Sequence, residues 1–151
     1  MYRGLRQAEA IFDANELVFM RFPPDQGGPK PGGWTVSRIL REHLHCSDQS
    51  FIRGQFGHPG DLGYPDYFDW GVLALPAIAV RVDLLSGDDL PREYRFDLRH
   101  MPLWNNYAHS EIQVCVDRER VHKVTTKVRH DFRKHLESRG AAIERSPSQC
   151  I

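Results

Sequence analysis

The residues of this chain best suited to chemistry are His109 and Glu111, which are separated by one residue. On a β-strand, side chains two positions apart lie on the same face, about 7 Å from each other. A histidine and a carboxylate placed in this way can share general acid and general base work on one substrate. Asp97, Arg99 and His100 precede them in the chain. These residue types are consistent with an acid–base site in which Arg99 binds an anionic group of the substrate.

The same residues also have a structural interpretation. If the two segments that hold them form an antiparallel hairpin, Asp97 would face His109 and Arg95 would face Glu111. Cross-strand ion pairs of this kind stabilise a sheet by a few tenths to about 1 kcal/mol each. The fragment His-x-Glu also occurs in the zinc deaminase signature, but no P-C-x-x-C follows it here. We therefore favour an exposed, ion-paired hairpin over an acid–base site, and we predict no metal there.

A second cluster, His43-Leu44-His45-Cys46, places three metal-binding side chains within four residues. The segment 35–45 has the apolar spacing of a helix, on which residues two apart point in different directions. His43 would lie in the apolar face and His45 nearly opposite it. No later pair of ligands has zinc-site spacing, and the sequence contains no glycine-rich nucleotide-binding motif. The sequence therefore predicts no metal site and no cofactor.

Charge is unevenly distributed along the chain, although 20 Lys and Arg residues balance 20 Asp and Glu residues. Residues 118–139 carry eight basic and three acidic side chains, whereas residues 57–97 carry three basic and eight acidic ones. On a helix, a basic ridge would lie opposite the apolar stripe and consist of Lys123, Lys127, His130 and Lys134. Such a ridge can bind phosphates, but it lacks the interleaved aromatic residues that stack on bases. A nucleic-acid partner and an ordinary solvated helix face are both consistent with this pattern.

Hydrophobic periodicity predicts the elements that position these groups. Strands are expected over 17–22, 50–56, 77–84, 93–99 and 107–116. Helices are expected over 7–14, 35–45 and 121–139, the last with an apolar stripe of Val121, Val124, Val128, Phe132 and Leu136. Loops rich in proline and glycine would cover 23–33 and 57–68, and periodicity does not decide between helix and strand for 70–80. The predicted fold class is α+β, a mostly antiparallel sheet of four to five strands with two to three helices packed on it in two layers.

Length and composition predict a single compact domain over residues 1–140 and a frayed tail over 141–151. Hydrophobic residues make up 40% and charged residues 26% of the 151 residues, as is typical of a globular protein. The three cysteines form no C-x-x-C pair, which favours a reducing compartment. We identify no signal peptide, and the longest apolar run, 72–80, is too short to span a bilayer. We therefore expect a cytoplasmic protein without a membrane partner.

The loop before His109 carries Trp104, Asn105 and Asn106, and an exposed tryptophan is a favoured anchor of protein interfaces. The segment from Pro102 to Ile112 resembles a stretch, P-x-x-N-x-A-H-x-x-I, of short bacterial proteins to which no activity is assigned. Here one additional residue lies before the alanine. This resemblance implies a bacterial source and favours a role for His109.

Two functions remain after these motifs are weighed. The first is a small bacterial protein-interaction module without its own catalysis, such as an adaptor, an immunity protein or a partner within an operon or defence system. Its partner would be another protein, encoded nearby, that meets its loops and charged patches. The second is a small phosphodiester- or RNA-acting enzyme or toxin. In that case His109 and His100 would transfer protons, Glu111 would orient a group or act as base, and Arg99 with the basic ridge would bind phosphate.

Overall fold

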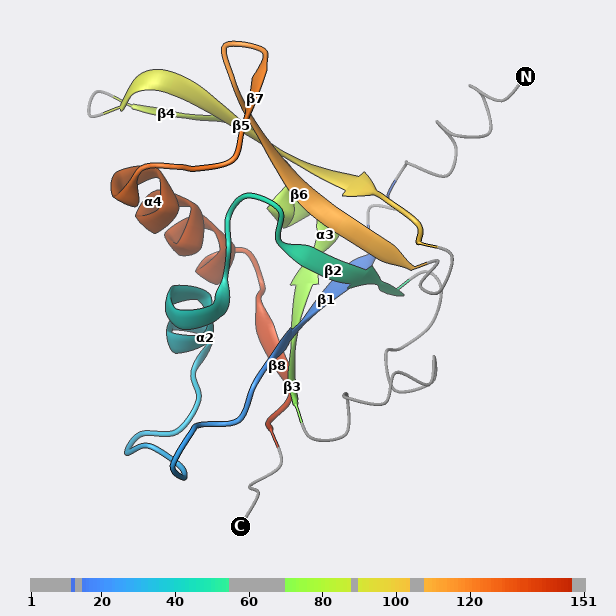
Figure 1. Ribbon diagram of the computed structural model, residues 1–151, viewed down its shortest axis with the longest axis vertical. Helices are drawn as coiled ribbons and strands as arrows, with labels where there is room; N and C mark the ends of the chain where they lie inside the picture. Colours follow the sequence, from blue (N-terminus) through green and yellow to red (C-terminus); the bar gives the residue numbers. More distant parts are fainter. Residues whose placement is uncertain (1–11, 13–14, 55–69, 88–89, 104–107, 148–151) are drawn as a thin grey trace.

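Figure 1 shows the computed structural model of the chain, in which residues 12, 15–54, 70–87, 90–103 and 108–147 are described. These residues form an α+β fold built on an antiparallel sheet. The strands are β1 (Leu17–Phe22), β2 (Ser50–Arg53), β3 (Gly71–Pro76), β4 (Val82–Gly87), β5 (Leu90–His100), β6 (His109–Val116), β7 (Glu119–Val121) and β8 (Ala142–Arg145). The helices are α2 (Val36–His43), α3 (Ala77–Val80) and α4 (Thr126–Glu137). Across the sheet the strands follow the order β4-β5-β6-β2-β1-β3-β8, and β7 pairs with β6 outside this path.

The main hydrophobic core lies between the sheet and the helices α2 and α4, which contact each other on the same side of it (Figure 1). Val128, Phe132 and Leu136 of α4 are fully buried. Phe132 stacks on Phe96 of β5, with ring centroids 4.0 Å apart and ring planes 9° apart. α2 contributes Ile39, which is also fully buried. The two helices therefore cover the sheet with apolar stripes of the spacing expected for amphipathic helices.

A smaller apolar cluster lies on the other face of the central strands. It consists of Phe19, Ile52, Val72, Ala74 and Ala108. On β1, Val18 and Met20 belong to the main core whereas Phe19 between them belongs to the smaller cluster. Successive side chains of a strand point to opposite faces. The centre of the sheet is therefore apolar on both of its faces.

Several predictions from the sequence are confirmed by this arrangement. β1 covers the predicted strand 17–22, and α2 begins and ends within two residues of the predicted helix 35–45. The Thr35 side chain caps α2 by accepting a hydrogen bond from the backbone N–H of Arg38. The expected alternation also appears in the burial of Tyr94, Phe96 and Leu98 on β5, and of Ser110, Ile112, Val114 and Val116 on β6. The α+β class and the antiparallel sheet are thus as predicted.

The number of strands and one connection differ from the prediction. The path across the sheet contains seven strands in the described residues, with β7 beside it, rather than four to five. The strand expected over 77–84 is instead a short helix, α3, followed by β4. Pro76 ends β3 and caps α3, and its missing N–H is of no consequence at the first turn of a helix. The segment that periodicity left ambiguous therefore contains a strand and a helix in succession.

The predicted helix 121–139 begins later than expected. Asp117 and Arg118 adopt positive φ values of 51° and 72°, and they form a tight turn that pairs β7 with β6. Val121 therefore lies on a strand, and Val124 precedes the helix. Thr125 caps α4 by accepting from the backbone N–H of Val128. Val121 and Val124 continue the apolar spacing of the helix before this cap. The spacing therefore predicted a longer helix and gave no sign of the turn at Asp117 and Arg118.

The tail is also more ordered than the sequence suggested. Gly140, with φ of 96°, follows the end of α4 as predicted. Residues expected to fray then form β8, which pairs with β3. The prediction for 141–151 is therefore wrong at Ala142–Arg145, because the backbone groups of β3 at this edge find partners there. The helix expected over 7–14, except for Phe12, and the loop expected over 57–68 lie outside the described residues. No helix among the described residues has both the length and the apolar character needed to cross a bilayer.

Candidate functional site

His109, the leading catalytic candidate, is held by contacts with two other segments. It begins β6 and is 8% exposed. Its Nδ1 lies 2.9 Å from the carbonyl oxygen of Met101, and its Nε2 lies 3.1 Å from the hydroxyl oxygen of Ser50. Because a carbonyl oxygen can only accept, Nδ1 donates to Met101, and in the neutral ring Nε2 then accepts from Ser50. Oε1 of Glu111 is 3.6 Å from the same Nε2. The imidazole therefore links β6 to β2 and to the residue that follows β5.

The contact between Ser50 and His109 has the geometry of a nucleophile and its base. In a Ser-His-Asp triad, a carboxylate accepts from the second ring nitrogen. Here the Met101 carbonyl has that position, while Glu111 lies on the Ser50 side of the ring. The pair can in principle polarise the serine hydroxyl. The same contacts also account for the burial of His109 without a catalytic role, since both of its ring nitrogens have hydrogen-bond partners.

The hairpin of β5 and β6 has a different register from the one expected. Asp97 lies opposite Gln113 rather than His109, and Arg95 lies opposite Cys115. The backbone N–H of Met101 donates to the carbonyl of His109 at 2.9 Å, so pairing continues past the end of β5. The predicted cross-strand pairs are therefore wrong. The periodicity of a strand fixes which face a residue occupies but leaves shifts by an even number of residues undetermined.

The other predicted members of the acid–base site have partners of their own. Oδ1 of Asp97 lies 3.3 Å from Nε of Arg81, and Oδ2 lies 2.9 Å from Nε of Arg99. Arg99 is opposite Glu111 in the sheet, and its side chain is 59% exposed. His100 is half-buried and lies opposite Ser110. These residues are neighbours on β5 and β6, but no described contact joins Asp97 or Arg99 to the His109 ring.

The predicted basic ridge is divided in the structure. Lys123 precedes α4 and is exposed. Nζ of Lys127 lies 3.1 Å from Oδ1 of Asp131, one turn further along the helix. His130 and Lys134 are exposed on α4. The ridge as predicted is therefore wrong in extent, because Lys123 lies before the helix and Lys127 is paired. The predicted binding residues Trp104, Asn105 and Asn106 lie outside the described residues.

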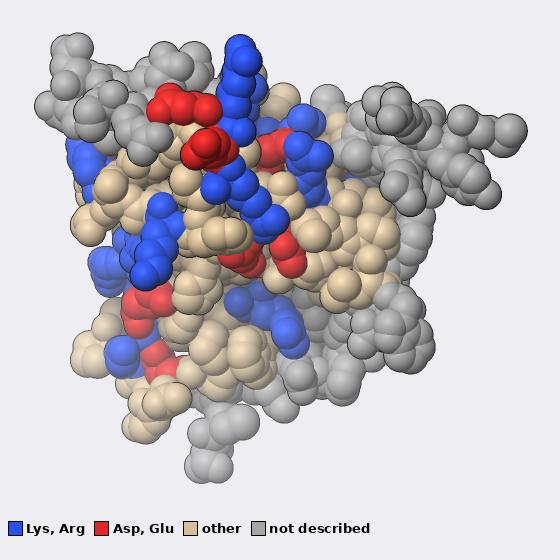
Figure 2. Space-filling model, turned by 45° about the horizontal axis from the view of Figure 1, so that its top comes forward, with Lys and Arg blue, Asp and Glu red and all other residues tan. Residues whose placement is uncertain are grey.

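A different group of basic residues gathers where α2 contacts α4. Arg41 belongs to α2, and Arg129 and Arg133 lie one turn apart on α4. We call these three residues the arginine site. Within the described part of the chain, none of them forms an ion pair with a carboxylate, and the buried Nε of Arg133 makes no hydrogen bond. Figure 2 shows Lys and Arg side chains on the left of the view with acidic side chains among them, and further Lys and Arg side chains at its top and centre.

The pKa values at this place reflect burial first and neighbouring charges second. Burial holds the pKa of Arg133 below its ordinary value, and Arg129 and Arg41 act in the same direction. Cys46, which follows α2 and is 2% exposed, acts in the opposite direction. Burial raises the pKa of the Cys46 thiol, although Arg133 and Arg129 lower it in part. The thiol is therefore protonated at neutral pH and supplies no negative charge to balance the arginines.

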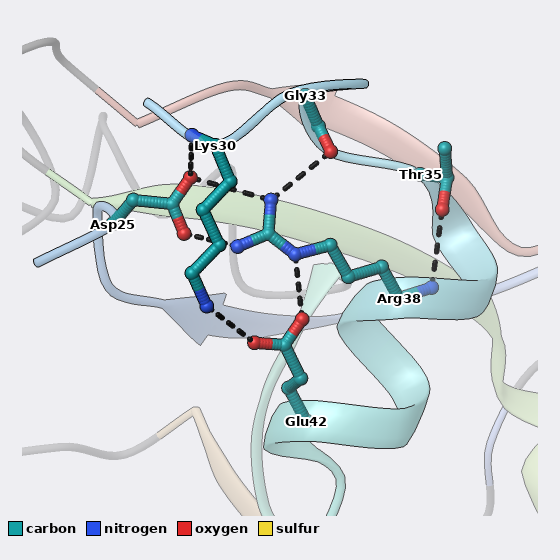
Figure 3. A network of polar contacts seen from close by, with 6 residues as sticks. All are labelled: Asp25, Lys30, Gly33, Thr35, Arg38 and Glu42. Carbon is teal, nitrogen blue, oxygen red and sulfur yellow. Dashed lines mark hydrogen bonds and ion pairs between the residues drawn. The ribbon is translucent and has the colours of Figure 1, made fainter. Parts of the chain in front are cut away.

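Three residues before Arg41, α2 carries an arginine in the opposite situation, Arg38, shown in Figure 3. Arg38 binds both carboxylate oxygens of Asp25, and its Nε donates to Oε2 of Glu42 at 2.5 Å. It also donates to the carbonyl oxygen of Gly33 at 3.0 Å. Nζ of Lys30 lies 3.6 Å from Oε1 of Glu42. These contacts fasten the proline- and glycine-rich loop to α2, so we assign Arg38 a structural role.

The cluster at the end of α2 follows the orientation that the sequence predicted. The His43 ring lies against Trp34 and Phe22, with centroid distances of 5.5 and 6.5 Å, while His45 is exposed. Cys46 is buried, so the three side chains do not converge. Among the described residues, no group of three or more His, Cys, Asp or Glu side chains could hold a metal ion.

Sequence reasoning did not single out the arginine site. Arg129 and Arg133 have the i, i+4 spacing that places two side chains on the same side of a helix. That spacing was the available signal, and it pointed to a different side of the helix from the predicted ridge. Arg41 joins the two others only because α2 contacts α4, which the sequence does not reveal.

Comparisons with protein-family models, curated proteins and solved structures gave no match. The functional argument therefore depends on the residues of this chain and on their contacts.

Proposed function

We propose that this chain is a small bacterial protein-interaction module, an adaptor, immunity protein or operon or defence-system partner of the cytoplasm, without catalysis of its own. The observation that supports the proposal is the arginine site, where Arg41, Arg129 and Arg133 have no carboxylate partner among the described residues. The bacterial source is suggested by the resemblance of the segment 102–112.

Unbalanced arginines at a helix contact favour a role in binding. Like charges that lie close together destabilise the unbound protein, and an anionic partner removes this repulsion. Arginine is enriched among the residues that dominate binding energy in protein interfaces, because its guanidinium group forms several hydrogen bonds and packs on flat surfaces. Complementary charge also speeds association and excludes wrong partners. The arginine site combines these properties in one small area.

The test is to identify a protein that binds the full chain and to measure its dependence on the arginine site. Candidates captured from the extract of the source cell after nuclease treatment would be purified and mixed with the chain. We expect a complex of fixed stoichiometry in gel filtration that Arg41→Gln or Arg129→Gln weakens. The matched control is Arg139→Gln, an exposed arginine beyond α4. Equal weakening by the control, or complexes that form only with nucleic acid, would contradict the proposal.

A second candidate function, a small phosphodiester- or RNA-acting enzyme or toxin, is favoured by one observation. The Ser50 hydroxyl oxygen lies 3.1 Å from Nε2 of His109, with Glu111 beside the same nitrogen. In this alternative His109 acts as base, and exposed basic residues around α4 attract the phosphates. His109 would have to release Ser50 or use it, because the ring has no other accessible nitrogen.

Turnover separates the two functions. An RNA oligonucleotide would be incubated with the chain and with His109→Gln and Ser50→Ala variants whose unfolding midpoints are compared. The interaction module predicts no cleavage by any of the proteins and weak oligonucleotide binding even at low salt. Cleavage that disappears with His109→Gln, in a variant that is still folded, would establish the enzyme in its place.

A further inference from the structure

The arginine site presents three guanidinium groups and no carboxylate at the contact of two helices. Arg129 and Arg133 face the same side of α4 from successive turns, and Arg41 belongs to α2, the helix that contacts α4. The buried Nε of Arg133 has no hydrogen-bond partner in the protein. A buried donor without a partner is uncommon, and it is satisfied in most proteins by water, an ion or a ligand. The site therefore has positive charge that an anion would neutralise, and a donor for which the protein supplies no acceptor.

We propose that the arginine site binds a phosphate monoester group. Such a group carries a charge of about −1.5 to −2 at pH 7 and three strong acceptor oxygens. A carboxylate has one charge and two oxygens, so it can balance only part of the site. Arginine pairs with phosphate oxygens through two parallel N–H bonds, which fits a cluster of three guanidinium groups around one tetrahedral group.

The surroundings of the arginine site favour a single phosphate group over a nucleic-acid backbone. Lys127 on α4 is already paired with Asp131, and Glu137 is exposed at the end of the same helix. Double-stranded DNA presents one negative charge about every 1.7 Å along its axis. A backbone laid along α4 would therefore bring phosphates close to these carboxylates. A single group at the contact with α2 would meet fewer of these carboxylates than an extended backbone would.

The phosphate group could belong to a phosphorylated side chain of a protein partner or to a small phosphate ester. The first source deepens the proposed function and rests on it, since the chain would then be a module that reads a phosphorylated partner. The second source does not need a protein partner. The recognition chemistry at Arg41, Arg129 and Arg133 is the same for both.

The direct probe is the Nε–Hε group of Arg133, observed by ¹⁵N–¹H NMR of the full chain. Inorganic phosphate would be titrated at constant ionic strength, with acetate as the carboxylate probe. We expect a saturable shift of this resonance with phosphate and a much smaller one with acetate. Arg133→Gln should weaken phosphate binding by about tenfold or more, as expected for a hydrogen bond between charged groups. Arg129→Gln should act in the same direction, so the result does not depend on a single variant.

Arg139→Gln is the matched control because it removes the same charge from an exposed position beyond α4. Its phosphate affinity should stay within about twofold of the wild type, as for a distant exposed charge. The proposal is overturned if phosphate causes no saturable shift, if acetate binds as well as phosphate, or if the control weakens binding as much as Arg133→Gln. Thermal unfolding of each variant shows whether a loss of binding reflects a loss of fold.

Two further titrations separate the sources and the functions. A phosphoserine peptide of otherwise neutral residues that binds more tightly than inorganic phosphate identifies a phosphorylated side chain as the source, whereas equal affinity identifies a small phosphate ester. An RNA oligonucleotide that binds more tightly than both, with a steep salt dependence, overturns the monoester proposal. If a protein partner binds equally well after phosphatase treatment, the interaction module stands, while a phosphorylated side chain of that partner is ruled out as the source. Saturable phosphate binding without any protein partner gives the reverse result.

Discussion

Arg38 and Arg133 lie on the two helices that cover the sheet, and their surroundings are opposite. Arg38 contacts two carboxylates, and the hydrogen bonds that it donates to Asp25 and Glu42 raise its pKa above the ordinary value against the effect of burial. Arg133 forms no ion pair with a carboxylate among the described residues, and burial with Arg129 and Arg41 lowers its pKa. The charge of Arg38 is therefore neutralised by carboxylates within the protein, whereas the charge of Arg133 is not.

This difference separates a structural arginine from a binding arginine. The contacts of Arg38 are all made within the chain, so its charge is used to hold a loop whose prolines and glycines form few backbone hydrogen bonds. The charge of Arg133 is not used in this way, and its Nε lacks a partner. Removing the first should weaken the fold, whereas removing the second should not. The predictions below test this contrast, starting from the residue with the most complete pairing.

Arg53 is the extreme case of an arginine balanced within the protein. It is fully buried, and its Nε and Nη2 each lie 2.8 Å from one carboxylate oxygen of Glu16. Its guanidinium also lies over the Phe12 ring, 4.0 Å from the centroid. We expect Arg53→Met to lower the free energy of unfolding by about 3–5 kcal/mol, because the Glu16 carboxylate stays buried without its guanidinium. Urea denaturation followed by circular dichroism measures this change.

The double variant Glu16→Leu, Arg53→Met is the control for this interpretation. Replacing a buried ion pair with apolar residues is often close to neutral, so the double variant should be clearly more stable than Arg53→Met. A loss below about 1 kcal/mol in the single variant would mean that the pair behaves like an exposed one.

Arg38→Met should come second in magnitude. The change removes the contacts with Asp25, Glu42 and Gly33, and the loop loses its attachment to α2. We expect a lower free energy of unfolding and faster cleavage of the loop by a protease under native conditions. The effect should be smaller than for Arg53 because Glu42 is partly exposed and water can replace the guanidinium there. Arg41→Met, on the same helix, is the matched control and should leave the rate of cleavage unchanged.

Arg133→Met should have the opposite sign. It removes a buried donor without a partner and the repulsion by Arg129 and Arg41, and it keeps most of the apolar contact made by the side chain. We expect the free energy of unfolding to rise by about 1 kcal/mol. Thermal unfolding in a buffer free of phosphate and sulfate measures it. If Arg133→Met destabilises the protein as Arg38→Met does, Arg133 is a structural arginine like Arg38, and the proposed difference between the two residues is wrong.

Sequence patterns predicted which side chains of an element are buried better than they predicted where the element begins or how it pairs with its neighbours. The alternation of Tyr94, Phe96 and Leu98 follows directly from burial on one face, so it was predictable from residue types. The register of β5 against β6 was not, because a shift by an even number of residues leaves that alternation unchanged. The start of α4 was missed because Val121 continues the apolar spacing of the helix by coincidence. The positive φ of Asp117 and Arg118 was the physical cause of the break.

The candidate sites show the same limit. His109 was correctly predicted to lie on a strand beside Glu111, but its contacts with Ser50 and Met101 come from segments distant in the sequence. The arginine site depends on which flank of α2 meets α4. Pairing within one helix can be predicted from spacing, as for Lys127 and Asp131. Contacts between elements require the packing of the whole domain.

We expect the smallest change in the free energy of unfolding at His43, which lies on α2 together with Arg38. Burial lowers the pKa of His43, with Arg38 and His45 acting in the same direction and Glu42 and Asp25 against it. The unfolded chain therefore takes up the proton more readily, so the free energy of unfolding should fall as the pH decreases below about 6.5 and level off below the folded-state pKa. His43→Gln should flatten this slope between about pH 7 and pH 5.5, a range above the titration of the carboxylates. An identical slope in His43→Gln would show that the packing of the His43 ring against Trp34 does not exclude the proton.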